Sequence, residues 1–453
     1  MAFKSIDRDT QFLFPPSVQD WLPEGHLARF VVDIVSQLDL RVLNASYKEN
    51  GEAAYPPSML LSLLFYGYAT GTFSSRSLER KTYDSIDFRY IAANTHPDHS
   101  TISWFRKKFL KELSPLFLQI LSIAAESGLL KLGTVSLDGT KMKANASRHK
   151  AMSYKYACEL EKKLKLEVKR LMKLAESADE SDIPDGMNLP EELKIREARL
   201  SKIAEAKAEI ERRAAERYEF EKNEYEEKLA EREKKARKKG RKPGGKPPQP
   251  PTAGPGEKDQ MNFTDPESRI MPKSGGGFEQ AYNAQASVDT DSRLIVGEHV
   301  SQKANDKQEL EPALLELDKL PDAAGRAEKL NADNGYYSET NVKACEREKI
   351  EPYIAMGREP HNQDVMDRFA APGPTPAEGA SAVERMGHRL KTPEGRRTYS
   401  LRKQVVEPVF GIIKSAMGFK QFMLRGLEKV SGEWTLVCLA YNLKRMHIMS
   451  QKS

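Results

Sequence analysis

Apolar residues recur at helical spacing through roughly the first 130 positions. In "DWLPEGHLARFVVDIVSQLDL" the apolar residues, among them Leu27, Val31 and Ile34, fall on one helical face. A second, more apolar helix is predicted in "YPPSMLLSLLFYGYATG", opened by a Pro-Pro pair and ended near Gly71. Further helices are predicted in "SSRSLERKTYDSIDFRYIA" and "HPDHSTISWFRKKFLKEL". This part of the chain is therefore expected to be helical.

The last of these helices carries Arg106, Lys107 and Lys108 beside Trp104 and Phe105. Several short helices with a basic final member suit a helix-turn-helix type of DNA contact. An ordinary helical bundle with a solvated basic face explains the same spacing equally well. Both interpretations stay open on spacing alone.

A strand is predicted in "LGTVSLD", ending at Asp138, and the pattern changes after it. From about Tyr154 to Lys235 a narrow apolar stripe runs among Lys and Glu and is broken once by "SADESDIPDGMNLP", which predicts an antiparallel helical hairpin. The following "KKARKKGRKPGGKPPQPPTAGPGEKD" is basic and rich in Pro and Gly, and is predicted to be a flexible loop. It could contact a phosphate backbone, or serve only as a solvated linker.

Strand patterns return after this insertion in "QAYNAQASVD" and "RLIVGEHVS". A helix is predicted in "NDKQELEPALLELDKL", then a strand in "AEKLNADNGYYS" that ends at Asp333, a helix at 338–348 and a short strand in "IEPYIAM". The polar stretch at 358–397 is expected to be loose, and two helices close the chain. This order predicts a mixed α/β fold, with helices able to cover both faces of one sheet.

Two predicted strands end in an acid at the same relative place, Asp138 and Asp333. If these strands are neighbours, the two carboxylates lie side by side, and a divalent cation removes their repulsion. All-oxygen ligands suit Mg²⁺ or Mn²⁺. Glu407 in "VVEPVFGIIK" is a candidate third ligand, although such long separations follow no local motif rule. An aspartate at a strand end is more often only a turn residue.

Composition narrows the class of protein. The chain has 453 residues, 39% hydrophobic and 30% charged, which fits a soluble globular protein of two or three domains. No apolar run reaches the roughly 20 residues of a membrane span, and "MAFKSIDRDTQFLF" lacks a secretory pattern. The 3 scattered cysteines suggest a reducing cytosol. A net charge of +6 permits nucleic-acid binding without requiring it.

Eight segments in order carry a resemblance to a known family. In the amino-terminal part they are "YPPSMLLSLLFYGYATGTFSSRSLER" and "PDHSTISWFRKKF". In the remainder they are "SLDGTKMKANAS", "NFTDPESRIMPK", "AYNAQASVD", "NADNGYYS", "YSLRKQVVEPVFGIIK" and "EWTLVCLAYNLKRM". With these segments the chain resembles the DDE transposases of bacterial insertion sequences, most closely the IS eleven-eighty-two-like group.

The resemblance implies a ribonuclease-H-like, retroviral-integrase-like mixed-sheet core. It implies Asp138, Asp333 and Glu407 as the catalytic, metal-binding acids, and a long helical insertion after the first core strand. The expected domains are a helix-turn-helix-like DNA-binding domain at 1–130, the first catalytic strand and turn at 131–150, the charged hairpin with its basic loop at 151–260, and the rest of the core at 261–453.

The late motif departs from the family's wider pattern. Related transposases carry tyrosine, two residues, arginine, three residues, glutamate, six residues, lysine. Here Tyr399, Arg402, Glu407 and Lys414 keep the first and last gaps, whereas the middle gap has four residues and begins with Lys403. The expected DNA contacts beside Glu407 are Tyr399, Arg402, Lys403 and Lys414. The basic residues of the amino-terminal helix are expected to contact DNA as well.

The longer gap leaves open which basic residue contacts phosphate. On a regular helix Lys403 would share a face with Glu407, whereas Arg402 would not. Pro408 lacks an N–H and favours a first helical turn, so the segment before it could be irregular and let Arg402 reach DNA. Lys414, which shares a helical face with Glu407, is the safer candidate.

The resemblance further implies two Mg²⁺ ions, replaceable by Mn²⁺, and DNA as partner, both terminal inverted repeats and target DNA. Cleavage at the ends of the element would be followed by strand transfer from a freed 3′-OH. A homodimer is expected in the synaptic complex, and a bacterial cytoplasmic location, with the protein on the nucleoid when DNA-bound. A catalytically silent DNA-binding regulator is the alternative, and a nuclease unrelated to transposition is a third interpretation.

Several other residues are predicted to be structural. Asp306 is predicted to cap a helix, and Asn334 and Tyr336 to shape a turn. Trp434 is predicted to lie in the core. The histidines His26, His96 and His99 have no partner acids at ligand spacing.

Overall fold

The computed structural model describes residues 17–47, 54–176, 188–239, 246–273, 275–357, 373–377 and 379–451. The chain forms two compact units. The first unit comprises Met1–Asn145, Met271–Gly277 and Ala281–Ser453, and the second comprises Ala146–Ile270 and Phe278–Gln280. The four-part domain division predicted from the sequence stays a prediction.

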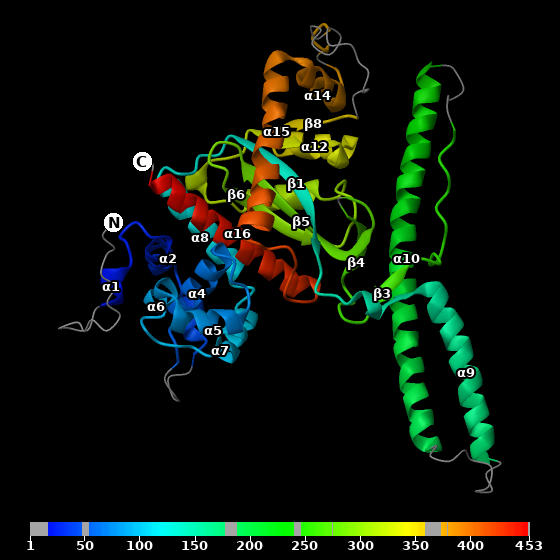
Figure 1. Cartoon of the computed structure of the whole chain (residues 1–453). Coiled ribbons are helices and arrows are strands. Elements are labelled where there is room, and N and C mark those ends of the chain that lie inside the picture. The colour runs from blue at the N-terminus through cyan, green and yellow to red at the C-terminus, as the bar shows by residue number, and fades with distance from the viewer. Residues whose placement is uncertain are drawn as a thin grey trace, which may run out of the picture. The chain divides into compact units, whose positions relative to one another are not determined.

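Helices precede the first strand of the chain, as the apolar spacing predicts (Figure 1). They are α1 (Val18–Trp21), α2 (Leu27–Ser36), α3 (Arg41–Ala45), α4 (Pro57–Ala69), α5 (Ser75–Asp84), α6 (Ile86–Ile91), α7 (His99–Lys108) and α8 (Leu113–Glu126). Pro57 stands in the first turn of α4, where its missing N–H costs nothing. Every residue of α4 from 60 to 69 is buried, so this helix is the centre of the helical region.

A mixed sheet forms the core of the first unit. Its strands are β1 (Thr134–Lys143), β4 (Arg269–Pro272), β5 (Phe278–Asp289), β6 (Ile295–Ser301), β7 (Lys329–Ala332) and β8 (Glu351–Ile354). The order is β4–β5–β1–β7–β8, and β6 also pairs with β5. Strand β1 runs antiparallel to β5 and parallel to β7, and β8 continues the parallel side. The predicted mixed α/β architecture is thus confirmed.

The helices after the sheet strands are α11 (Leu310–Asp318), α12 (Glu339–Arg347), α14 (Ala382–Lys391), α15 (Pro393–Gly411) and α16 (Leu427–Ser450). A π-helical turn, Ile412–Ala416, continues α15. Helix α15 packs on β1, and α16 packs on β6 and α4. Figure 1 shows α15 passing along β1.

The stretch at 358–397 was expected to be loose, and this is wrong for its described C-terminal part. Ser381 and Glu384 form a capping box that starts α14. Thr392 caps α15, and Pro393 occupies its first turn. The polar composition suggested a loop, but these residues are helix-starting signals. Residues 358–372 lie outside the described part of the chain.

The amino-terminal helices and α16 share a buried polar network. The Tyr68 hydroxyl donates to Glu433 Oε1 at 2.9 Å, and Glu433 Oε2 accepts the backbone N–H groups of Met423 and Leu424, each at 2.9 Å. Arg106 donates to the Tyr68 oxygen at 3.1 Å. Burial raises the pKa of the Glu433 carboxyl, and its hydrogen bonds and Arg106 oppose that shift. The helical region is therefore built into the core of the first unit.

The second unit is built on two long helices, α9 (Tyr154–Glu176) and α10 (Leu189–Lys239), with the strand pair β2 (Ala151–Ser153) and β3 (Gln260–Asn262). Contacts between the helices run in opposite senses along the two sequences. Arg196 pairs with Glu167, Lys207 with Glu161, and Tyr154 with Glu211. The helices are thus antiparallel. That this pair is the insertion typical of the resembled family stays a prediction.

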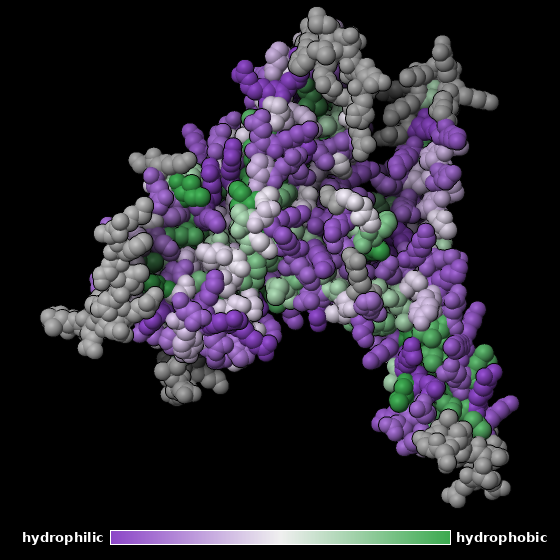
Figure 2. All heavy atoms as spheres, in the orientation of Figure 1, coloured by the Kyte–Doolittle hydropathy of each residue, from purple (hydrophilic) through white to green (hydrophobic). Residues whose placement is uncertain are grey.

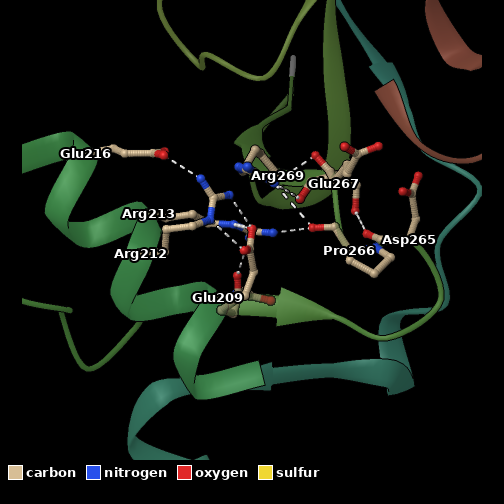
Figure 3. Close-up of polar contacts among 10 residues, drawn as sticks. Glu209, Arg212, Arg213, Glu216, Asp265, Pro266, Glu267 and Arg269 are labelled. Carbon is tan, nitrogen blue, oxygen red and sulfur yellow. Dashed lines mark hydrogen bonds and ion pairs between the residues drawn. The ribbon is translucent and has the colours of Figure 1, made fainter. Parts of the chain in front are cut away.

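A hydrogen bond from an arginine of α10 also holds the segment after β3 (Figure 3). Arg213 donates to Glu209 at 2.7 Å and to the Pro266 carbonyl. Arg269 donates to the Glu267 carbonyl at 2.8 Å. The guanidinium of Arg213 therefore contacts both a side chain of α10 and the backbone carbonyl of Pro266, and so connects the helix to the segment after β3.

The basic Pro/Gly-rich segment was predicted to be a flexible loop, and its residues 246–259 do form a loop, although its flexibility stays a prediction. Arg232 donates to the Lys246 carbonyl at 2.8 Å, and Arg217 pairs with Asp259 at 2.8 Å. The segment has no regular secondary structure, yet charged residues of α10 hold it in place. Residues 240–245 lie outside the described part of the chain, and the phosphate contact proposed for this segment stays a prediction.

Apolar side chains are exposed on the hairpin at Leu166, Met172 and Ile195. Figure 2 shows hydrophobic surface where α9 ends and α10 begins.

Among the helices of the described residues, none combines the length and apolar character that crossing a membrane requires.

Replacing Trp434 with alanine is expected to lower the free energy of unfolding by about 3–5 kcal/mol. The side chain is fully buried, and its Nε1 donates to the Gln285 carbonyl at 3.0 Å. Urea unfolding followed by circular dichroism measures the loss. Trp104→Ala is the matched control, because Trp104 is 50% exposed and should lose much less. Equal losses for the two variants would contradict a core role for Trp434.

Candidate active site

Asp138 lies on β1 and Asp333 directly follows β7, and these two strands are neighbours in the sheet. Strands β1 and β7 are parallel, and Ser136 pairs with Asn331 at the last position of their ladder. Continuing this register by two residues brings Asp138 opposite Asp333. Asp333 follows β7 and caps the 3₁₀ turn Asn334–Tyr336, accepting the Gly335 N–H at 2.7 Å.

Asp138 does not end its strand, and in this detail the prediction is wrong. Strand β1 runs on to Lys143 because β5 continues to pair with it as far as Ala281. The parallel partner β7 does end before Asp138. The backbone of Asp138 is therefore paired with β5 on one side, whereas on its other side the pairing with β7 has already ended.

The Asp138 carboxylate is enclosed by polar partners. Its Oδ1 accepts the Gly139 N–H at 2.8 Å, and its Oδ2 accepts from Arg402 Nη1 at 3.1 Å. The pKa of Asp138 is raised from 3.8 to about 6, mainly by burial, with smaller contributions from the negative charges of Asp333 and Asp306. The Gly139 N–H and the Arg402 guanidinium act in the opposite direction. An anion in this position is thus only partly compensated by the protein, and added positive charge would stabilise it.

Helix α15 is regular through the segment before Pro408, for which the sequence left both a regular and an irregular conformation open. It runs from Pro393 to Gly411 with Pro408 inside it. Arg402 is buried on the face that packs on β1 and reaches Asp138, whereas Lys403 is exposed. The longer gap in the motif thus brings Arg402, and not Lys403, to the first aspartate.

Lys414 and Tyr399 also lie against the site. The Lys414 ammonium donates to the hydroxyl of Thr140, which stands two residues after Asp138 on the same face of β1. Tyr399 is partly buried, and burial raises the pKa of its phenol while Arg402 lowers it. Glu407 is exposed and lies about two helical turns before Lys414.

The three acids do not form a ready-made cluster. Within the described residues no group of three or more His, Cys, Asp or Glu side chains is arranged to hold a metal ion. The donor set nevertheless suits a hard divalent cation, because Asp138 and Asp333 offer only oxygen and lie in register. The raised pKa of Asp138 points to the same need for a cation. Glu407 on its exposed helix flank would have to turn toward them.

The three basic residues of α7 differ in their surroundings. Arg106 is buried and donates to the Phe73 carbonyl at 2.9 Å, so its side chain is not on the surface as a DNA contact requires. Lys108 lies 4.6 Å from the ring centre of Trp104. Lys107 is exposed. Of these three residues of α7, Lys107 and Lys108 are exposed and remain candidates for the predicted DNA contact.

Asp306 was predicted to cap a helix, and this is wrong. Helix α11 begins at Leu310, and no side chain caps it. Instead Asp306 Oδ1 accepts from Lys141 at 3.0 Å, Asn283 at 2.7 Å and Gln285 at 2.8 Å. The signal for this cluster is in "YNAQAS", because polar residues at alternate positions of a buried strand require polar partners on that face.

Trp434, Tyr336 and the three histidines that were expected to be structural make structural contacts, whereas Asn334 is exposed and its role stays a prediction. Trp434 is in the core, and Tyr336 is fully buried. His26 caps α2, His96 contacts Thr82 and His99 pairs with Glu79, an acid that sequence spacing did not indicate. None of these contacts is made with the candidate acids.

This arrangement is consistent with the ribonuclease-H-like core of a DDE-type enzyme. Residues 16–108 match a family described as a transposase domain (DUF772), and residues 375–447 match the transposase DDE domain. Both matched families are transposase domains, and the second is of the DDE type. No curated protein and no solved structure matches the chain. The second match contains Arg402 and Glu407, whereas Asp138 and Asp333 lie outside both.

Asp138→Asn is expected to stabilise the protein near neutral pH. The pKa of Asp138 is raised to about 6, so between roughly pH 4 and 6 the folded protein keeps a proton that the unfolded chain has lost. Stability therefore falls as pH rises through this window and stays lower above it. The substitution removes this cost, at most about 3 kcal/mol above the window and little below it.

Thermal unfolding across the same pH range measures this effect. Asp318→Asn, at an exposed position, is the matched control for the loss of one charge. An Asp138→Asn variant that is no more stable than the wild-type protein above the window would contradict the raised pKa.

Proposed function

We propose that this protein binds the terminal inverted repeats of an insertion sequence and catalyses metal-dependent DNA cleavage followed by strand transfer. The observation that carries the proposal is the placement of Asp138 and Asp333 in register on neighbouring parallel strands. They belong to a chain that contains both transposase domains. We place the protein, as part of this proposal, in the IS eleven-eighty-two-like group of these transposases.

Asp138, Asp333 and Glu407 are the proposed ligands of two Mg²⁺ ions, for which Mn²⁺ can substitute. Such a pair of ions activates a water or a DNA 3′-OH and stabilises the leaving oxygen. Asp138 lies between the other two elements, β7 and α15, and is the proposed shared ligand. The buried backbone of β1 and β7 fixes two ligands, and helix α15 supplies the third.

Arg402 and Lys414 are proposed to hold the DNA phosphate beside these acids, with Tyr399 and Lys403 next to them. A guanidinium pairs with a carboxylate and with a phosphate through the same planar donors. In this proposal the metal ions neutralise the Asp138 carboxylate, and the Arg402 guanidinium is then free to bind a DNA phosphate in place of Asp138. Lys414, which donates to the Thr140 hydroxyl, lies two positions further along the same strand face.

The proposed partners are the terminal repeats, the target DNA and a second copy of the chain in the synaptic complex, because two ends must be held together. Lys107 and Lys108 are proposed contacts to the repeats. The bacterial cytoplasm, with the nucleoid as the site of DNA binding, is the proposed location. A catalytically silent regulator is not favoured, because both candidate aspartates keep the required placement.

Asp138→Ala and Asp333→Ala are each expected to reduce DNA cleavage more than about a hundredfold, because each removes a ligand that no neighbour replaces. The purified protein is incubated with DNA spanning a terminus of its element and Mg²⁺ or Mn²⁺, and nicked product is measured on denaturing gels. Binding of the same DNA should be largely retained.

Asp291→Ala, in the exposed turn between β5 and β6, is the control and should cleave normally. A wild-type protein that binds the terminus without nicking it would instead favour the regulator. Normal cleavage by either catalytic variant would rule out that residue as a ligand.

Lys107→Ala is expected to weaken binding to terminal DNA and to reduce the salt dependence of binding. Each lost phosphate contact lowers the slope of log K against log salt by about 0.9. Fluorescence anisotropy at several salt concentrations measures both quantities. Lys111→Ala is the control, because Lys111 pairs with Glu428 at 2.9 Å. An unchanged slope for Lys107→Ala would remove this residue from the interface.

A further inference from the structure

We propose that Asp306 is a positioning residue of the active site, which fixes the spacing between Asp138 and Asp333. Asp306 lies in the loop between β6 and α11, far in sequence from both acids. The inference rests on the proposed function, because it assigns a role to that same site. It depends on three sets of contacts around Asp306.

The first set joins Asp306 to the two central strands. One carboxylate oxygen, Oδ1, accepts from Lys141 on β1 and from Asn283 and Gln285 on β5. The ion pair with Lys141 has a length of 3.0 Å, and both side chains are about four-fifths buried, with 20% and 23% of their surfaces exposed. Three donors on one oxygen, one of them charged, hold this loop firmly against β1 and β5.

The second set concerns the glycine that follows Asp138. A Cβ added to Gly139 would lie 2.8 Å from Asp306 Oδ1 and would collide with the Gln285 amide. The missing side chain is therefore what allows Asp306 to approach β1 next to the candidate ligand. The Gly139 N–H donates to Asp138, so the same residue connects Asp306 to the orientation of the Asp138 carboxylate.

The third set reaches the turn that carries Asp333. The buried Tyr336 hydroxyl donates to Gln285 Oε1, while the other end of that amide donates to Asp306. Asn341 Nδ2 donates to the Lys307 carbonyl at 2.7 Å and to the Tyr336 carbonyl at 2.6 Å. The loop of Asp306 and the turn after Asp333 are therefore tied together twice.

Asp306 and Asp333 also border the same glycine. A Cβ on Gly335 would lie 2.9 Å from Asp333 Oδ1 and 3.7 Å from Asp306 Oδ2. A third negative charge here adds to the repulsion at Asp138. A residue that served packing alone would not need this charge. The carboxylate charge of Asp306 forms the ion pair with the Lys141 ammonium, which a neutral amide oxygen could not do.

The test compares Asp306→Asn with the wild-type protein and with Asp318→Asn, an exposed control on α11. Asp306→Asn keeps the shape but loses the charge that holds Lys141. We expect the cleavage rate at saturating DNA to fall about 10- to 100-fold, and the Mg²⁺ concentration for half-maximal cleavage to rise. DNA affinity should be unchanged. Calorimetric titration of Mn²⁺ into the protein without DNA should show weaker binding.

Tyr336→Phe is the second variant, and it decides the matter if Asp306→Asn does not fold. It removes only the hydroxyl bonded to Gln285, and should change cleavage rate and Mn²⁺ affinity in the same direction by a smaller factor. An active wild-type protein with unchanged rate and Mn²⁺ affinity in these variants would overturn the inference. So would a lowered melting temperature with normal Mn²⁺ affinity. A folded wild-type protein that does not cleave would instead overturn the proposed function and this inference with it.

Discussion

The parallel pairing of β1 with β7 is the constraint on which the candidate active site depends. It joins residues 195 positions apart, and its register alone decides whether Asp138 meets Asp333. A shift of one residue would turn one of the two carboxylates to the opposite face of the sheet. Ser136 and Asn331 hold the register through a buried hydrogen bond at 3.4 Å, and Asn331 also donates to the Thr398 carbonyl of α15 at 3.0 Å. The same asparagine thus places the helix that carries Arg402.

Placing these acids together has an electrostatic cost that the surrounding residues only partly offset. Asp138 is partly neutralised by Arg402, whereas the negative charges of Asp333 and Asp306 act against it. Perturbed pKa values of this kind cluster at functional sites, where stability and activity compete. The helical region is joined to the same core through Tyr68 and Glu433, and it belongs to the first unit together with most of the sheet.

Much of the fold could be predicted from the sequence. Apolar spacing and proline positions predict α2 and α4, and strand patterns predict the mixed sheet that the structure confirms. The errors occurred where composition hid local signals. Ser381 and Thr392 start helices inside a Pro/Gly-rich stretch that was expected to be loose. Polar composition alone does not distinguish a loop from a segment whose partners lie elsewhere in the chain.

The candidate residues for the chemistry can be named from the sequence and its resemblance to a known family, and their roles stay predictions. The acids Asp138, Asp333 and Glu407 and the basic residues of the late motif are all identifiable from ordered local segments. Only the tertiary structure decided that Arg402 pairs with Asp138 across 264 positions, that Arg106 is buried, and that Asp306 joins β1 to β5. The physical reason is that a local segment specifies helices, strands and turns through nearby contacts, whereas burial and charge pairing depend on distant residues that the fold brings together.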